Sequence, residues 1–106
     1  MTTPFRCVVM GDESLALQCA EILLSGGHTV AAVVTRDETV STWAEDKKIP
    51  LVPPGKDLAP RLREKAGDIA WLFSVANLSI IPAEVLALPS KGSINFHDGP
   101  LPRYAG

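Results

Sequence analysis

Residues 5–34 read FRCVVMGDESLALQCAEILLSGGHTVAAVV, and this stretch decides the fold class. The runs FRCVVM (5–10) and VAAVV (30–34) are short and apolar, as buried strands are. Between them, apolar residues repeat at the helical period, at Leu15, Cys19, Ile22 and Leu23. Asp12 or Ser14 is expected to cap this helix, and Gly26-Gly27 to end it. The order strand, helix, strand predicts a βαβ unit with parallel strands.

The remaining residues continue the alternation of apolar runs and helical patterns. We expect helices over residues 39–47, 57–66 and 83–88 and strands over residues 69–75 and 93–97. Residues 49–55 form an extended segment whose prolines keep it from being a central strand. The chain is therefore predicted to be an α/β protein, a Rossmann-like parallel sheet with helices on both faces.

Composition excludes several classes of protein. The 106 residues carry a net charge of -2, and no basic stripe of the kind that binds nucleic acid is present. No apolar run is long enough to span a bilayer, and the first residues lack the layout of a signal peptide, so we expect a cytoplasmic protein without membrane contact. Cys7 and Cys19 are twelve apart and His28 is far from His97, so no metal site is predicted.

The chemistry is expected at the carboxyl ends of the strands, where open α/β sheets bind ligands. Gly11-Asp12, Ala76-Asn77 and Asn95-Phe96-His97 stand at three such ends. Alternation along a strand places Asn95 and His97 on one side and Phe96 on the other. A carboxamide can donate to an oxygen that becomes negative during acyl transfer, and an imidazole can polarise a carbonyl or move a proton. The pair indicates direct attack by a substrate amine, because neither residue is a nucleophile.

A longer string around this pair resembles a known family. Residues 92–106, GSINFHDGPLPRYAG, resemble the formyltransferase signature G-x-x-N-x-H-x-S-x-L-P-x-Y-x-G, and residues 75–82, VANLSIIP, look like the segment that holds the folate pterin in that family. The resemblance implies that residues 1–106 are the N-terminal portion of a formyltransferase catalytic domain. It implies catalytic roles for Asn95 and His97 and 10-formyltetrahydrofolate as the formyl donor. The folate would lie against Ala76, Asn77, Leu78, Ser79, Ile80, Ile81, Gly99, Pro100, Leu101 and Pro102.

Two departures from the family pattern affect the expected activity. The third catalytic residue of the family, an Asp in a later loop, would fall beyond Gly106, and Asp98 does not replace it because it lies on the other side of the strand from His97. Gly99 stands where the family usually has Ser, which removes one hydroxyl. We therefore expect residues 1–106 alone to be inactive and further domains of a longer parent chain to follow.

The acceptor amine is the least defined part of the prediction. The sequence of residues 95–106 is similar to that of formyltransferase domains in peptide-synthetase and polyketide assembly lines. This similarity implies that the acceptor is an aminoacyl group on a carrier protein. Methionyl-tRNA and a sugar amine are the alternatives. Residues 35–41 are short and nearly neutral where tRNA formyltransferases carry a basic insertion, and Asp12 and Glu13 would repel a substrate phosphate.

A different class remains open, a non-catalytic Rossmann-like module that binds a nucleotide. Gly11 stands alone after the first strand, without the other glycines of G-x-G-x-x-G. Residues 34–36, Val-Thr-Arg, lack the acidic residue that follows the second strand in dinucleotide sites. Formyl transfer is the favoured reading.

Overall fold

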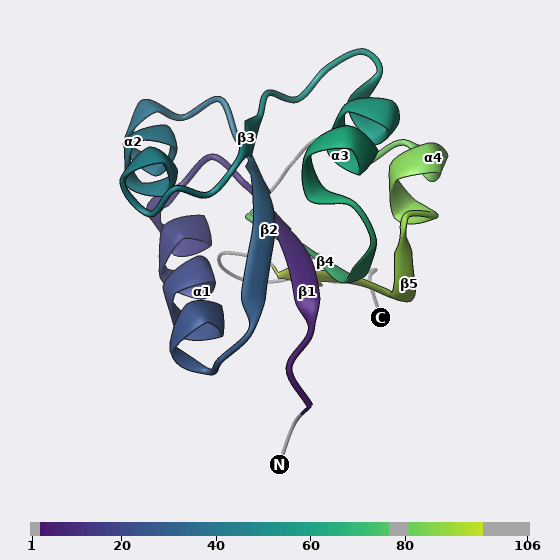
Figure 1. Ribbon diagram of the computed structural model, residues 1–106. Coiled ribbons are helices and arrows are strands. Elements are labelled where there is room, and N and C mark those ends of the chain that lie inside the picture. The colour runs from purple at the N-terminus through teal and green to yellow at the C-terminus, as the bar shows by residue number, and fades with distance from the viewer. Residues whose placement is uncertain (1–2, 77–80, 97–106) are drawn as a thin grey trace, which may run out of the picture.

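The computed structural model describes residues 3–76 and 81–96. In this part of the chain, five parallel strands form one sheet in the order β3-β2-β1-β4-β5 (Figure 1). The elements in chain order are β1 (Arg6–Met10), α1 (Ser14–Ser25), β2 (Thr29–Val34), α2 (Glu38–Asp46), β3 (Leu51–Val52), α3 (Leu58–Ala66), β4 (Ile69–Val75), α4 (Ala83–Leu86) and β5 (Pro89–Phe96). The predicted α/β class with a parallel Rossmann-like sheet is confirmed.

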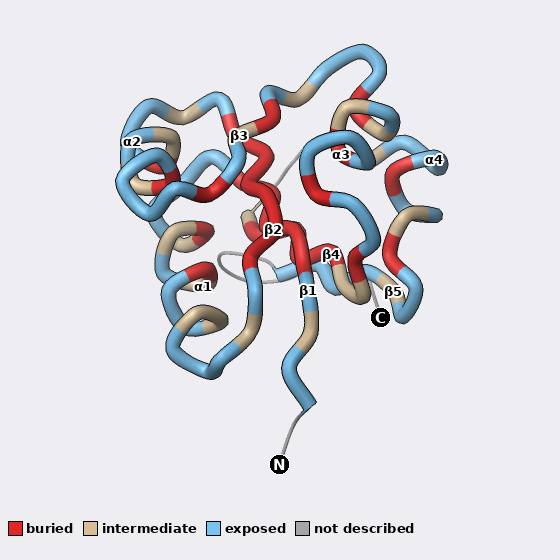
Figure 2. The backbone as a smooth tube through the Cα atoms, in the orientation of Figure 1, coloured by how far each residue is buried: buried red, intermediate tan, exposed pale blue. Residues whose placement is uncertain are grey.

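The helices lie on both faces of the sheet, α1 and α2 on one and α3 and α4 on the other (Figure 1). Alternate side chains of each strand therefore enter different cores. Val8 and Leu72 pack with residues of α3 and α4, whereas Val9 and Phe73 pack with residues of α1 and α2. The buried residues concentrate along the strands between these layers (Figure 2). No helix among the described residues has the length and apolar character needed to cross a membrane.

The proline-rich segment forms the edge of the sheet, as its sequence predicts. β3 has only two residues, Leu51 and Val52, and pairs with β2 alone. The N–H of Val33 donates to the carbonyl of Pro50 at 2.9 Å, which uses the proline as an acceptor only. Proline is tolerated here because an edge strand leaves one row of its backbone groups outside the ladder.

The expected bounds of the last helix and strand were wrong. The helix ends at Leu86 rather than residue 88, and the strand begins at Pro89 rather than residue 93. Local sequence hid this extension because Pro89 and Gly92 are poor strand formers. Pairing of β5 along the whole length of β4, from Ile69↔Pro89 to Val75↔Phe96, overrides that preference. Pro89 is the first residue of the strand, where a missing N–H costs least.

The expected cap of α1 was also wrong. The residue before the helix is Glu13, and its side chain makes no capping hydrogen bond. The Asp12 carboxylate instead accepts from the Thr35 hydroxyl at 3.0 Å and from the Arg36 N–H at 2.8 Å. Asp12 therefore joins the ends of β1 and β2 instead of starting a helix.

Three ring side chains, Trp43, Trp71 and His28, link separate parts of the fold. The Trp43 indole N–H donates to a Glu21 carboxylate oxygen at 3.2 Å, linking α2 to α1, while the Trp71 ring lies against the backbone of Gly92 on β5. The His28 ring stacks on Phe5 with centroids 3.8 Å apart, and its Nδ1 accepts the Phe5 N–H at 3.3 Å. These contacts hold the turn after α1 against the residue that precedes β1.

Lys48 offers a stability test because it follows α2 in a left-handed conformation, with φ at 61°. A non-glycine residue pays a steric cost there that glycine avoids. Lys48→Gly is expected to raise the free energy of unfolding by about 1 kcal/mol in urea titrations. The matched control is Lys47→Gly, whose φ of -84° is helical, so glycine should destabilise the protein there. Equal effects at both positions would contradict the assigned end of α2.

Cys7 gives an expected alkaline dependence of stability. Burial, with a smaller contribution from Cys19, raises the pKa of the Cys7 thiol from 9.0 to about 12. The unfolded chain therefore loses this proton first, so the stabilisation is complete below about pH 9 and decreases as the pH rises toward 12. Urea unfolding from pH 8 to pH 10.5 should show this decrease, and Cys7→Ala should flatten it. An equally steep decrease in the variant would assign it to other groups.

Candidate functional site

Three strand ends that carry polar residues lie next to one another in the sheet. Met10 of β1 pairs with Ser74 of β4, and Ser74 pairs with Asn95 of β5. Paired residues of parallel strands point to the same face, here the face of α3 and α4, since Leu72 of β4 belongs to that core. Neighbouring strands are about 4.8 Å apart, so the Met10 and Asn95 Cα atoms are separated by about 10 Å. The described residues of these strand ends therefore lie at one edge of the sheet, whereas Asn77 and His97 are outside the described residues.

Asn95 is exposed at the carboxyl end of β5. Phe96 stacks with Phe73 at a centroid distance of 6.2 Å on the opposite face, so the Asn95 side chain faces away from that aromatic pair. Beside Asn95, Ser74 is 1% exposed, and its hydroxyl has no hydrogen-bond partner in the described part of the chain. The other expected catalytic residue, His97, lies outside the described residues.

Two residues of the expected folate site are described, Ala76 and Ile81. Ala76 has a positive φ of 51°, and its N–H donates to the carbonyl of Phe96 at 2.9 Å, which ties the end of β4 to the end of β5. Ile81 is half-buried and packs against the core of α3 and α4. The other residues expected to contact folate lie outside the described residues: Asn77, Leu78, Ser79, Ile80, Gly99, Pro100, Leu101 and Pro102.

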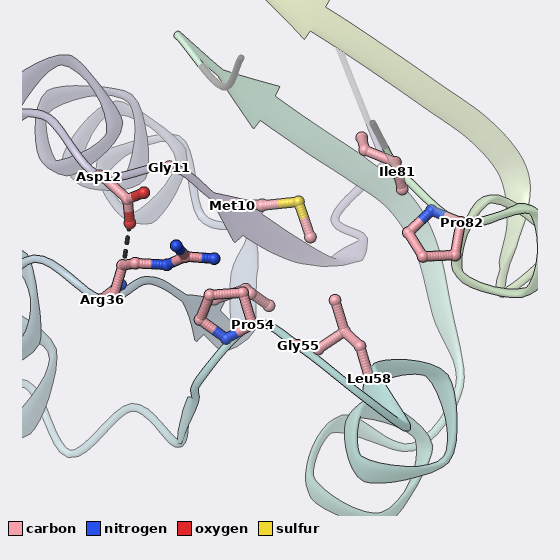
Figure 3. A pocket seen from close by; sticks show the side chains of 10 residues that line it. Met10, Gly11, Asp12, Arg36, Pro54, Gly55, Leu58, Ile81 and Pro82 are labelled. Carbon is pink, nitrogen blue, oxygen red and sulfur yellow. Dashed lines mark hydrogen bonds between the residues drawn. The ribbon is translucent and has the colours of Figure 1, made fainter. Parts of the chain in front are cut away.

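A cavity of about 210 Å³ opens at the same edge of the sheet (Figure 3). It lies between the end of β1 and the residues that follow β4, where the chain order of the sheet reverses direction, and ligands of open α/β sheets collect at such a point. Its lining residues are Met10, Gly11, Asp12, Val34, Arg36, Pro54, Gly55, Leu58, Ile81 and Pro82.

Sequence reasoning identified part of this cavity and missed the rest. Gly11 and Asp12 stood among the residues expected at strand ends and Ile81 among those expected to contact folate, but Arg36 and Pro54 were assigned to polar or extended connections. Arg36 comes two residues after β2 and Pro54 two residues after β3. A search for every residue just beyond a strand end, polar or not, would have found both.

Gly11 is required by close packing at the mouth of the cavity. A Cβ at this position would lie 2.5 Å from the carbonyl oxygen of Val75 and 2.9 Å from the Cβ of Ala16. The Gly11 N–H donates to the carbonyl of Val34 at 3.0 Å. Any side chain would push β1 away from β4, so this glycine keeps the strand ends together.

A metal centre finds no support in the described residues, because no three of their His, Cys, Asp or Glu side chains come together. Arg36 and Asp12 are the charged residues on the cavity wall. The arrangement is therefore an apolar cavity with a charged rim, at the edge of the sheet that also carries Asn95.

Comparison with known proteins identifies the family, although no family model matches. The chain is 33% identical over 117 residues to a methionyl-tRNA formyltransferase of Pelotomaculum thermopropionicum, covering 95% of this chain and 37% of the relative. It is 32% identical over 120 residues to that of Stutzerimonas stutzeri, covering 100% of this chain and 38% of the relative. The chain belongs to the formyltransferase family. A third such relative, from Acetivibrio thermocellus, is 32% identical over 95% of the chain.

The match of this formyltransferase-family chain covers only part of the length of its relatives. It spans just over a third of the length of the curated relatives that it matches. These relatives are named for methionyl-tRNA as substrate, and none of those cited is an assembly-line domain. The similarity to peptide-synthetase and polyketide domains expected from residues 95–106 is not supported by them.

Proposed function

We propose that this protein takes part in transfer of a formyl group from 10-formyltetrahydrofolate to a primary amine. The observation that carries the proposal is the position of Asn95, at the carboxyl edge of a formyltransferase-family sheet and in register with Ser74 and Met10. A hydrogen-bond donor at this edge is where a developing negative charge would be stabilised.

The described residues fit the donor. A pterin is a flat ring that needs an apolar wall and a few polar contacts. Ile81 and Pro82 supply apolar surface beside the cavity. The residue after β4, Ala76, has a left-handed conformation, and the segment that would hold the pterin begins there, close to Asn95 on the neighbouring strand. 10-Formyltetrahydrofolate would supply the formyl group, and residues 76–81 and 99–102 would hold its folate portion.

Each proposed catalytic residue has a defined role. The Asn95 NH₂ donates to the formyl oxygen as the attacking amine nitrogen makes it negative. His97 polarises the formyl carbonyl or carries the proton that the amine loses as its new C–N bond forms. The bond between the formyl carbon and the folate nitrogen would break in the same reaction, and the proton lost by the amine would pass to that nitrogen through His97.

The relatives favour methionyl-tRNA as the acceptor, and we place it first. One observation counts against tRNA and keeps the alternative, an aminoacyl group on a carrier protein. Only residues 35–37 separate β2 from α2, which leaves no room for a basic insertion that grips tRNA. A sugar amine has no described feature in its favour.

Donor binding provides the test, because it can be measured without the acceptor. Tetrahydrofolate at one hundred times its dissociation constant should stabilise the chain by about 2.7 kcal/mol, which raises the midpoint of thermal unfolding by several degrees. NAD should have no such effect. If NAD raises the midpoint of thermal unfolding and tetrahydrofolate does not, the proposal is wrong and the chain is better described as a nucleotide-binding module.

Asn95 is tested by comparing two forms of the ligand. Asn95→Ala should weaken 10-formyltetrahydrofolate roughly two- to tenfold in calorimetric titrations, since one hydrogen bond to the formyl oxygen is lost. Tetrahydrofolate, which lacks that oxygen, should bind the variant as before. Ser93→Ala is the matched control, because Ser93 is exposed two residues earlier on the same face of β5. Equal losses for both ligands would remove Asn95 from the proposed role.

A further inference from the structure

The cavity between β1 and β4 carries two opposite charges that do not pair with each other. Asp12 and Arg36 both line it, yet no ion pair within 4.0 Å joins them or any other described residues. One oxygen of Asp12, Oδ1, accepts both the Thr35 hydroxyl and the Arg36 N–H. These two hydrogen bonds fix the carboxylate at the rim of the cavity. Oδ2 accepts no hydrogen bond from any described group, so it is available to a ligand.

Arg36 is placed by its backbone while its guanidinium group remains available. Its N–H is held by Asp12 at 2.8 Å, and the side chain extends from the end of β2 into the space between Met10 and Pro54 (Figure 3). No described group accepts a hydrogen bond from this guanidinium, whereas Arg61 donates from all three of its nitrogens to backbone carbonyls. A guanidinium presents a planar fork that suits a carboxylate.

The rest of the cavity wall is apolar. Met10, Val34 and Leu58 are buried at its base, and Pro54 and Ile81 stand at its sides. Methionine is flexible and adapts to the shape of an aliphatic ligand. A ligand that fits must therefore carry one negative group, one positive group and an aliphatic portion, and it must be small enough for about 210 Å³.

We propose that this cavity binds a zwitterionic aliphatic α-amino acid. Arg36 holds the carboxylate, Asp12 Oδ2 accepts from the ammonium group, and the aliphatic side chain lies on Met10 and Leu58. A charged pair on the wall matches a zwitterion without net repulsion, whereas a doubly charged phosphate would be repelled by Asp12. The inference does not depend on the role of Asn95, since its two charged contacts come from residues that follow β1 and β2, although Ile81 on the cavity wall is also part of the proposed folate site.

Ligands that each lack one charge test the proposal on the chain itself. L-Methionine should bind in calorimetric or NMR titrations, and methioninamide and N-acetylmethionine should bind about tenfold more weakly, because each lacks one charged contact. Affinity should increase about three- to fourfold for each buried methylene from alanine to norleucine. No detectable binding of methionine or norleucine would overturn the proposal.

Variants assign the two charges. Arg36→Gln should weaken methionine about tenfold and leave methioninamide unchanged, because the amide has no carboxylate to lose. Asp12→Asn should weaken methionine and leave N-acetylmethionine unchanged, and the asparagine oxygen can still accept from Thr35 and the Arg36 N–H. Arg63→Gln is the control for net charge, since Arg63 is exposed in the last turn of α3, outside the cavity.

A nucleotide is the competing ligand class, and titration with AMP tests it. AMP binds through a phosphate and would use Arg36 without the ammonium contact. If AMP binds more tightly than methionine and loses affinity in Arg36→Gln, the cavity is a nucleotide site and the amino-acid proposal is wrong. If Arg36→Gln and Arg63→Gln weaken methionine equally, the contact is not at this cavity and the proposal also fails.

Discussion

Replacing Leu72 by alanine is expected to lower the free energy of unfolding by about 2–5 kcal/mol. Leu72 lies in the middle of β4, is 1% exposed and pairs with Val8 on one side and Ser93 on the other. Its side chain belongs to the core shared with α3 and α4. The loss combines the transfer of methyl groups out of an apolar environment with the cavity left between the sheet and these helices.

Urea titrations followed by circular dichroism would measure this loss. Leu86→Ala is the matched control, since the same atoms are removed from a side chain of α4 that is 45% exposed. The control should cost much less, because a half-exposed leucine leaves no closed cavity. If both variants lose the same free energy, the packing of α3 and α4 on this face of the sheet is not as described.

Gly11→Ala is the second substitution with a large expected effect. Its methyl group would lie 2.5 Å from the carbonyl oxygen of Val75, and backbone cannot move aside as a side chain can. We expect a loss of about 1–3 kcal/mol, because β1 and β4 must separate. This separation would also distort the cavity, so the affinity for methionine should fall together with stability.

Gly26→Ala is the control for the loss of a glycine. Gly26 has a φ of -78°, and the nearest atom to an added Cβ is in the His28 ring at 3.3 Å, which can shift. The change in unfolding free energy should be within about 0.5 kcal/mol, as at ordinary surface positions. A Gly11→Ala variant as stable as Gly26→Ala would mean that the strand ends are farther apart than the structure has them.

The fold could be predicted from the sequence because local patterns and tertiary structure agree in most of the chain. The apolar run IAWLFSV at 69–75 is a strand with the bounds that its sequence predicts. β5 is the exception, since Pro89 and Gly92 argue against a strand and only pairing with β4 forms one. Propensity describes a residue in isolation, and this strand depends on a partner that is about twenty residues earlier.

The candidate site could be predicted in part for a similar reason. Asn95 could be proposed because strand alternation and a family resemblance both pointed to it. A position just beyond a strand end marks Arg36 as a candidate, but its place on the cavity wall without an ion-pair partner could not be predicted. That place depends on which strands are neighbours and on how the Arg36 side chain leaves the end of β2. Asp12 was expected to cap a helix and instead connects two strand ends, a choice between partners that no local pattern decides.

The two tryptophans lie in different parts of the fold, so their fluorescence can report on those parts separately. Trp43 lies where α2 meets α1, with its indole N–H on Glu21, whereas Trp71 lies over Gly92 where β4 meets β5. A variant that keeps only Trp43 would report by fluorescence on the docking of the helical pair, and one that keeps only Trp71 on the closing of the β4–β5 pair. Stopped-flow traces of the two variants would then show whether the strand that presents Asn95 joins the sheet together with the rest of the protein or after it.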